Sequence, residues 1–259
     1  MSAIKAGTMK PSLKDGAIMN KTERTRILRQ AQTWFRTVIL PNHLKNTRKL
    51  AVAAKLDINP FLAPYLAVYL TGELTPEALA KVLIYPRVLG SSITTSFGQN
   101  IQKFISDVLD SFGSMVTGID IEFLDQIDGR KKYCQIKLGP NTINKDDVAS
   151  IHGHFKSARN LGRTNHVEVA HGDLVVAILY GETGQESNHY KRLRDKHGYP
   201  LYIGKDFWHR LTGDESFYDE LRFAISEVAL EAEGSEALND TIKKLAASTH
   251  IQQIAQLKS

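Results

Sequence analysis

Apolar residues in the first half of the chain recur three and four positions apart, which is the spacing of helices that bury one face. One such stripe runs from Ile27 to Ile39, and we expect its helix to end before Pro41. Thr75 followed by Pro76 predicts the start of another helix, because threonine is a favoured N-cap and proline suits the first helical position. A further apolar face comprises Phe97, Ile101, Phe104, Ile105, Val108, Leu109 and Phe112. We expect these stripes to pack as the core of a helical region.

The spacing of apolar residues changes to two near the middle of the chain, which is typical of β-strands. It predicts strands at about residues 119–124 and 133–138, joined by a two-residue type I′ turn at Asp128-Gly129. We expect a helix from about Asn144 to Asn160 and a buried strand from about Asp173 to Tyr180. This order of helices and strands predicts an α/β core with helical additions at both ends.

A regular type I′ turn fixes which residues of the two strands face each other. Counting outward from it puts Glu122 opposite Gln135 and Asp120 opposite Lys137, at cross-strand distances of roughly 5 Å. The other face of the hairpin is then apolar and comprises Ile119, Ile121, Phe123, Cys134, Ile136 and Leu138. A slip of one residue would reverse both faces, so the two assignments support each other.

Composition narrows the class of protein. The chain has 259 residues, of which 42% are hydrophobic, which suffices for a large core and argues against global disorder. A net charge of +5 weakly favours a polyanionic partner. Cys134 is the single cysteine, so an internal disulfide and a multi-cysteine zinc site are excluded, and its place on the apolar face predicts a packed thiol. Because no segment has the pattern of a signal peptide or a membrane span, we expect a soluble, cytoplasmic protein.

The polar face of the hairpin carries residue types that suit phosphodiester hydrolysis. Asp120 can hold Mg²⁺, which prefers oxygen ligands and lowers the pKa of a bound water. Lys137 beside the cation can orient the attacking water and stabilise negative charge on the phosphate. The second metal ligand stays open between the amide oxygen of Gln135 and the carboxylate of Glu122. The same four residues are also compatible with the solvated face of a purely structural hairpin.

The order of these residues resembles the PD-(D/E)xK nuclease superfamily, in which an acid opens the second strand and a (D/E/Q)-x-K tripeptide lies on the third. Gly118-Ile119-Asp120 stands in place of the usual Pro-Asp, and Gln135 occupies the acid position, which puts the second metal ligand in doubt. Over about residues 57–211 the chain is also similar to type II restriction endonucleases that cut interrupted GGNCC-type palindromes. The similar segments are Ile58–Phe61, Pro86–Gly90, Ser96–Gly98, Val175–Gly181 and Gly204–Trp208.

The resemblance implies a restriction-endonuclease-like core, with a mixed sheet flanked by helices, and Mg²⁺-dependent hydrolysis that leaves double-strand breaks in DNA. The expected organisation is a flexible arm at residues 1–20, a helical region at 21–115 that dimerises or embraces DNA, a nuclease core at 116–215, and one or two C-terminal helices at 216–259. Each subunit of a homodimer would cut one strand of a palindromic site. A cognate DNA methyltransferase is expected in the same restriction-modification system, with no direct contact implied.

Two segments with basic residues are candidates for DNA contact. One is the end of the helix that begins near Asn144, and the other is the segment 188–194, which interleaves basic and aromatic residues. The first is equally compatible with a solvated helix end, where basic residues interact favourably with the helix dipole. The candidate contact residues are Asn141, Lys156, Arg159, Asn188, Lys191, Arg192 and Arg194.

Two other functions stay open at this point. Another nuclease of the same superfamily would share Asp120 and Lys137 without being a palindrome-reading dimer. A non-catalytic DNA-binding protein would bind DNA without a metal and would tolerate Lys137→Ala. His152 and His154 are two residues apart on a helix and so point in different directions, which favours packed or exposed histidines over a metal site.

Overall fold

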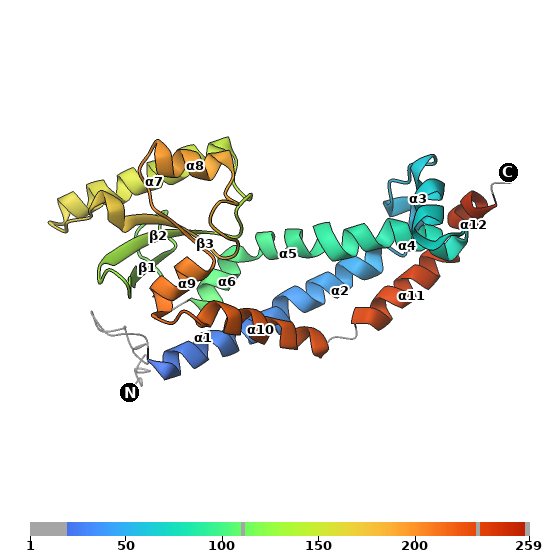
Figure 1. Ribbon diagram of the computed structural model, residues 1–259, viewed down its shortest axis with the longest axis horizontal. Helices are drawn as coiled ribbons and strands as arrows, with labels where there is room; N and C mark the ends of the chain where they lie inside the picture. Colours follow the sequence, from blue (N-terminus) through green and yellow to red (C-terminus); the bar gives the residue numbers. More distant parts are fainter. Residues whose placement is uncertain (1–19, 110–111, 232–233, 257–259) are drawn as a thin grey trace, which may run out of the picture. The chain divides into compact units, whose positions relative to one another are not determined.

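The structure is a computed structural model that describes residues 20–109, 112–231 and 234–256 (Figure 1). The expected flexible arm at residues 1–20 lies outside the described residues, apart from Asn20. The chain forms two compact units. Of the described residues, the first unit combines those up to 31 with those of 101–224, and the second combines residues 32–100 with those after 224.

The first unit is built on a four-stranded mixed sheet, which confirms the predicted α/β fold. Strands β1 (Ile121–Leu124) and β2 (Lys131–Lys137) are antiparallel, and β3 (Leu174–Ile178) and β4 (Leu201–Ile203) continue the sheet in parallel with β2. All residues of β3 are buried, as its apolar run predicts. The sequence does not predict β4, because three residues are too few to establish an alternating pattern.

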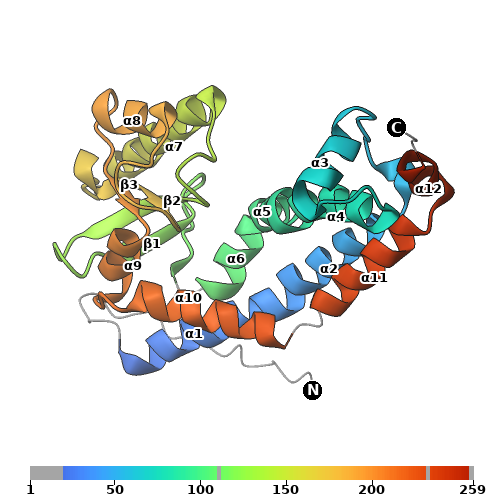
Figure 2. The ribbon, with the colours of Figure 1, turned by 45° about the vertical axis from the view of Figure 1, so that its right-hand side comes forward.

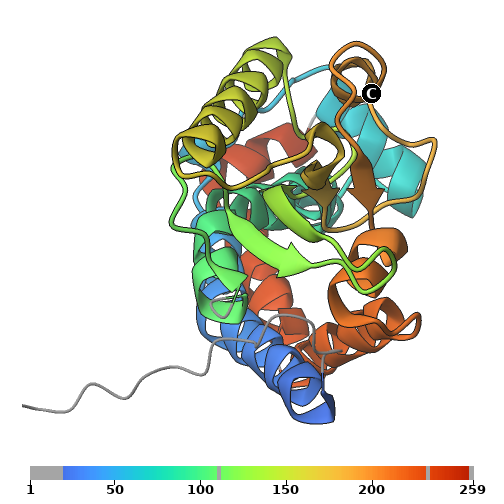
Figure 3. The same cartoon turned by 90° about the vertical axis from the view of Figure 1, so that its left-hand side faces the viewer.

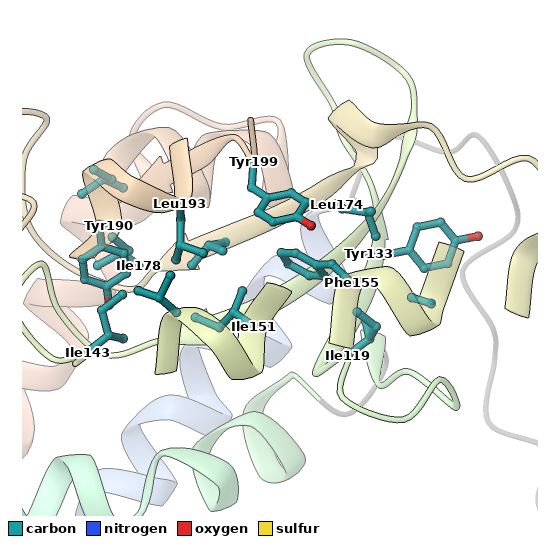
Figure 4. Packing of buried hydrophobic residues seen from close by; sticks show 14 residues of the cluster. Ile119, Tyr133, Ile143, Ile151, Phe155, Leu174, Ile178, Tyr190, Leu193 and Tyr199 are labelled. Atoms are coloured by element: carbon teal, nitrogen blue, oxygen red, sulfur yellow. The ribbon is translucent and has the colours of Figure 1, made fainter. Parts of the chain in front are cut away.

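Helices cover both faces of this sheet (Figure 3). α7 (Lys145–Thr164) and α8 (Asn188–Asp195) lie on one face, and α9 (Lys205–Thr212) lies on the other, where the rings of Phe123 and Phe207 are 6.2 Å apart. Figure 4 shows the apolar cluster on the α7 side, which comprises Ile119, Tyr133, Ile143, Val148, Ile151, Phe155, Ala158, Leu174, Val176, Ile178, Tyr190, Leu193, Tyr199 and Ile203. This packing holds α7 over the strands that carry the predicted site.

α7 begins where the sequence predicts. The side chain of Asn144 accepts hydrogen bonds from the backbone N–H groups of Asp146 (2.8 Å) and Asp147 (3.0 Å), and the Asp147 carboxylate accepts the N–H of Asn144 (2.9 Å). This reciprocal capping box satisfies backbone donors that would otherwise be unpaired at the helix start. The helix continues to Thr164, four residues beyond the expected end at Asn160.

The hairpin between β1 and β2 is shifted by two residues from the predicted register. Glu122 lies opposite Tyr133 and not opposite Gln135. Asp120 precedes the paired residues and donates its backbone N–H to the carbonyl of Cys134 (2.9 Å), so the expected pairing of Asp120 with Lys137 is wrong as well. Since side chains alternate with a period of two, a shift of two residues leaves the residues of the paired strands on their predicted faces.

A buried aspartate explains the shifted register. Asp125 donates its backbone N–H to the carbonyl of Arg130 (2.9 Å), which leaves four residues in the turn where two were expected at Asp128-Gly129. The fully buried Asp125 carboxylate accepts the backbone N–H of Ile127 (2.9 Å) and a hydrogen bond from Arg210 (2.8 Å). These bonds stabilise the wider turn over the two-residue type I′ turn.

The first unit also contains η5 (His171–Asp173), α6 (Ile101–Val108), most of α1 (Lys21–Trp34) and part of α10 (Phe217–Leu230). The apolar face predicted around α6 is largely buried, although the helix is interrupted at Asn100. Arg24 in α1 pairs with Asp214 (2.5 Å) just before α10. α1 and α10 are thereby tied together within this unit.

The second unit is helical and centred on α4 (Pro76–Pro86) (Figure 2). Thr75 caps α4 as predicted, because its hydroxyl accepts the backbone N–H of Ala78 (3.1 Å). α4 packs against α3 (Leu62–Thr71) and α11 (Gly234–Ala246). The other elements are η1 (Phe35–Ile39), α2 (Leu40–Lys49), η2 (Ala53–Lys55), η3 (Arg87–Ser92), α5 (Ile93–Gln99) and α12 (Thr249–Ala255).

The helix that begins at Lys21 does not end before Pro41, contrary to the expectation. The π-helical turn η1 joins α1 directly to α2, and Pro41 lies in the first turn of α2. A π turn is wider than an α turn and accommodates the ring and the missing N–H of proline. α10, α11 and α12 occupy the C-terminal region, where one or two helices were expected. None of the helices in the described part of the chain combines the length and apolar character needed to cross a membrane.

Candidate active site

Asp120 immediately precedes β1 and is tied to β2 by two hydrogen bonds. Its backbone N–H donates to the carbonyl of Cys134 (2.9 Å), and its Oδ2 accepts the backbone N–H of Ile136 (2.7 Å). Burial raises the pKa of the Asp120 carboxyl above its ordinary value, and this effect outweighs the opposing effects of the Ile136 N–H, the Lys137 charge and the Gln102 side chain. The surroundings therefore stabilise the negative charge of the Asp120 carboxylate only in part, which favours binding of a cation.

Lys137 ends β2 on the same face as Gln135, two residues earlier. Its Nζ is 3.8 Å from Oδ1 of Asp147, in the first turn of α7, and both side chains are partly exposed. The Lys137 charge lowers the pKa of Asp120, so the ammonium lies within electrostatic reach of that carboxylate. Asp120 and Lys137 thus lie at the ends of neighbouring strands, without the predicted cross-strand pairing.

Gln135 is buried, and two groups hold its amide in place. Nε2 donates to the carbonyl oxygen of Gly118 and lies 2.8 Å from Nδ1 of His154, which projects from α7. Gly118 has a φ of 80°, and a Cβ at this position would lie 2.4 Å from Cγ of His154. Glycine is therefore required here. Ile119 follows this turn before β1 begins and packs in the α7 cluster, not on the opposite face where it was expected.

The Glu122 side chain binds residues other than the predicted site residues. Its carboxylate accepts a hydrogen bond from the hydroxyl of Ser114 (2.6 Å) and pairs with the ammonium of Lys131 (2.7 Å). In the shifted hairpin Glu122 lies opposite Tyr133, away from the position expected for it opposite Gln135. The structure thus brings the other three predicted residues together and directs Glu122 elsewhere.

Three polar residues beside the site were not predicted to belong to it: Gln102, Asp147 and His154. Ile151 is a buried residue of α7. Asp147 lies four residues before it, and His154 lies three residues after it. This spacing puts all three on one stripe of the helix, so polar residues on the sheet-facing stripe are a signal that could have found two of them. Gln102 lies on α6 and carries no such signal.

The donor set suits a hard divalent cation. The Asp120 carboxylate and the Gln135 amide supply oxygen atoms, and Mg²⁺ needs few protein ligands because it keeps several waters. The raised pKa of Asp120 agrees with this, since a cation would supply the charge that the surroundings lack. Across residues 20–109, 112–231 and 234–256, no group of three or more His, Cys, Asp or Glu side chains is arranged to hold a metal ion.

The candidates for DNA contact lie in the first unit, on α7, on α8 and in the segment between β2 and α7. Arg194 forms ion pairs with the buried Glu186 (2.6 Å) and with Asp195 (2.7 Å), so it also stabilises the fold around α8. Arg159 lies 3.4 Å from a ring nitrogen of His171. The exposed members of the set for which the described residues show no ion pair are Asn141, Lys156, Asn188 and Arg192.

The contacts of Cys134 and His152 indicate that both side chains stabilise the fold. Cys134 is fully buried, and burial raises the pKa of its thiol well above the ordinary value, which confirms the prediction of a packed thiol. His152 lies 2.8 Å from the hydroxyl of Tyr199 and packs against the ring of His197. Neither residue has the features of a nucleophile at this site.

Comparison with known proteins identifies one family. The sequence model described as type II restriction endonuclease EcoO109I matches residues 37–233, about three quarters of the chain. The match includes β1, β2 and α7, and hence Asp120, Gln135 and Lys137. A comparison with curated proteins found no match.

Proposed function

The chain belongs to the family of type II restriction endonuclease EcoO109I and is therefore a DNA-cleaving hydrolase, and we propose that it uses Mg²⁺ to cut both strands of a short palindromic site of the GGNCC type. We assign the chemistry to Asp120, Gln135 and Lys137 on a PD-(D/E)xK core. The observation that carries this assignment is the part-buried Asp120 carboxylate with its raised pKa, which is bound to β2 beside the other two residues.

Each of the three residues has a separate task. Asp120 binds the cation through its carboxylate, and Gln135 contributes its amide oxygen. Mg²⁺ supplies Lewis-acid activation of the phosphoryl oxygen and acidifies a bound water. Lys137 orients the attacking water and stabilises the negative charge that develops on the phosphate. Asp147, 3.8 Å from the Lys137 ammonium, limits the positions that this side chain can take.

Cutting both strands of a palindrome calls for two copies of the chain, because two-fold symmetry of the protein matches that of the site. Helix α3 supports a homodimer, since it buries Ala63 and Ala67 and exposes a continuous apolar surface. The exposed side chains are Phe61, Leu62, Tyr65, Leu66, Val68, Tyr69 and Leu70, each between 42% and 87% exposed. A standard interface buries about 800 Å² per partner, and contiguous apolar patches of this kind mark interfaces. We propose that the α3 surface meets its copy in the dimer.

DNA contact is assigned to α7, α8 and the segment before α7. Lys156, Lys191 and Arg192 would bind phosphates, which positions the protein without reading sequence. Arginine or lysine side chains in the major groove would read guanine O6 and N7 of a GG half-site. A cognate methyltransferase in the same restriction-modification system would protect the host's own sites.

Digestion of plasmid and phage DNA by the purified protein in Mg²⁺ tests this function. We expect discrete fragments, and sequencing of their ends should reveal one palindromic motif with both strands cut symmetrically. Ends scattered without a shared motif would contradict the proposed site-specific dimer.

A further inference from the structure

His154 and Gly118 form a cradle around the amide of Gln135. His154 extends from α7 toward Gly118, where a Cβ would lie within 2.8 Å of three atoms of the histidine side chain. Gln135 is 5% exposed, and its Nε2 reaches both the Gly118 carbonyl and Nδ1 of His154. The Gln135 side chain, two residues before Lys137 on β2, is thus held in part by a helix that contributes neither Asp120 nor Lys137.

Hydrogen-bond chemistry settles how the amide is oriented. The Gly118 carbonyl can only accept, so the Gln135 atom that faces it must be the NH₂ group. The same nitrogen faces Nδ1 of His154, which must therefore accept as well, with the ring proton on Nε2. Both amide protons are used by these two acceptors, and Oε1 is the part of the amide that remains for an external ligand.

We propose that His154 is a positioning residue that, together with the Gly118 carbonyl, presents Oε1 of Gln135 to the divalent cation. This inference rests on the proposed function and deepens it. It also gives a reason for glutamine at this position. A glutamate would set a carboxylate oxygen against the carbonyl of Gly118, which can only accept, whereas the NH₂ group of an amide satisfies that carbonyl.

The test measures Mn²⁺ binding to the full-length protein by calorimetry, with the metal alone as the probe. His154→Phe retains a planar ring without an acceptor, and we expect about tenfold weaker binding, as for other residues that orient metal ligands. His152→Phe, on the same helix but in contact with Tyr199, is the matched control and should bind Mn²⁺ within about twofold of the wild type. In a Gln135→Ala background, His154→Phe should cause no further loss, because the group it positions is gone.

An equal loss from His154→Phe with and without Gln135 would overturn the proposal, as would wild-type binding by His154→Phe alone. If His154→Phe lowers the melting temperature, His154→Gln decides, because it keeps an acceptor. Near-wild-type affinity of that variant supports the proposal, and affinity as low as that of Gln135→Ala contradicts it. Asp120→Ala separates this inference from the proposed function: if that variant binds Mn²⁺ like the wild type, the metal site itself is wrong.

Discussion

Replacing Asp120 by asparagine should stabilise the metal-free protein while abolishing its cleavage activity. The Asp120 carboxyl is part-buried and its pKa is raised, so its ionised form is disfavoured in the folded chain. As the pH rises, the unfolded chain loses this proton first, and the folded state loses stability between the unfolded and the folded pKa. Asparagine keeps an acceptor for the Ile136 N–H (2.7 Å in the wild type) and carries no charge.

At pH values above the folded-state pKa of Asp120, we expect Asp120→Asn to raise the free energy of unfolding by about 1 kcal/mol. Gains of this size are typical when a functional residue with an unsatisfied charge is replaced. For a chain of this size that corresponds to a rise of roughly 2–4 °C in melting temperature. The assay is thermal unfolding in EDTA from acidic to neutral pH, comparing Asp120→Asn with the wild type. The difference should be absent at acidic pH and present at neutral pH.

Addition of Mg²⁺ should reverse the order of stability, because the cation binds the folded wild type and not the variant. A melting temperature of Asp120→Asn below that of the wild type in EDTA at neutral pH would refute the reasoning. It would mean that the protein itself already compensates the Asp120 charge.

In chemical denaturation, Asp125→Ala should lower the free energy of unfolding by about 3 kcal/mol, because it removes the buried carboxylate that pairs with Arg210. Asp206→Ala removes a more exposed partner of the same arginine and should lower it by less than about 0.5 kcal/mol. Similar losses for the two variants would contradict the account of the turn. Arg192→Ala should weaken DNA binding and reduce the slope of log affinity against log salt by about 1, and an unchanged slope would remove this residue from the phosphate contacts. Tyr65→Glu should convert the dimer to a monomer in sedimentation and suppress double-strand cleavage, while Leu230→Glu, at another exposed apolar position, should leave the dimer intact; a dimeric Tyr65→Glu would exclude the α3 interface.

Local signals account for the parts of the fold that the sequence predicts. The cap at Asn144 and the apolar run of β3 each depend on neighbouring residues, and both are found where expected. The faces of the hairpin strands are also predicted, because alternation is unaffected by a shift of two residues. These features are the basis on which Asp120, Gln135 and Lys137 are proposed to form one site.

The features that the sequence does not predict depend on contacts between distant residues. The hairpin register is set by Asp125 and its bond to Arg210, which lies 85 positions later in the chain. The orientation of Gln135 depends on His154, 19 positions away on a helix. Neither partner can be identified until the sheet and its helices are assembled, which is why Glu122 was expected opposite Gln135 and not opposite Tyr133.

The central proposal is a metal-dependent site formed by Asp120 and Lys137, and cleavage by the corresponding variants tests it directly. Plasmid DNA would be incubated with wild type, Asp120→Ala, Lys137→Ala and the control Lys131→Ala, in Mg²⁺ or in EDTA, with DNA binding measured in parallel by gel shift. We expect cleavage by the wild type and by Lys131→Ala in Mg²⁺ alone, and no cleavage by the other two variants although they still bind DNA. Cleavage in EDTA, or wild-type cleavage by Lys137→Ala, would contradict the account.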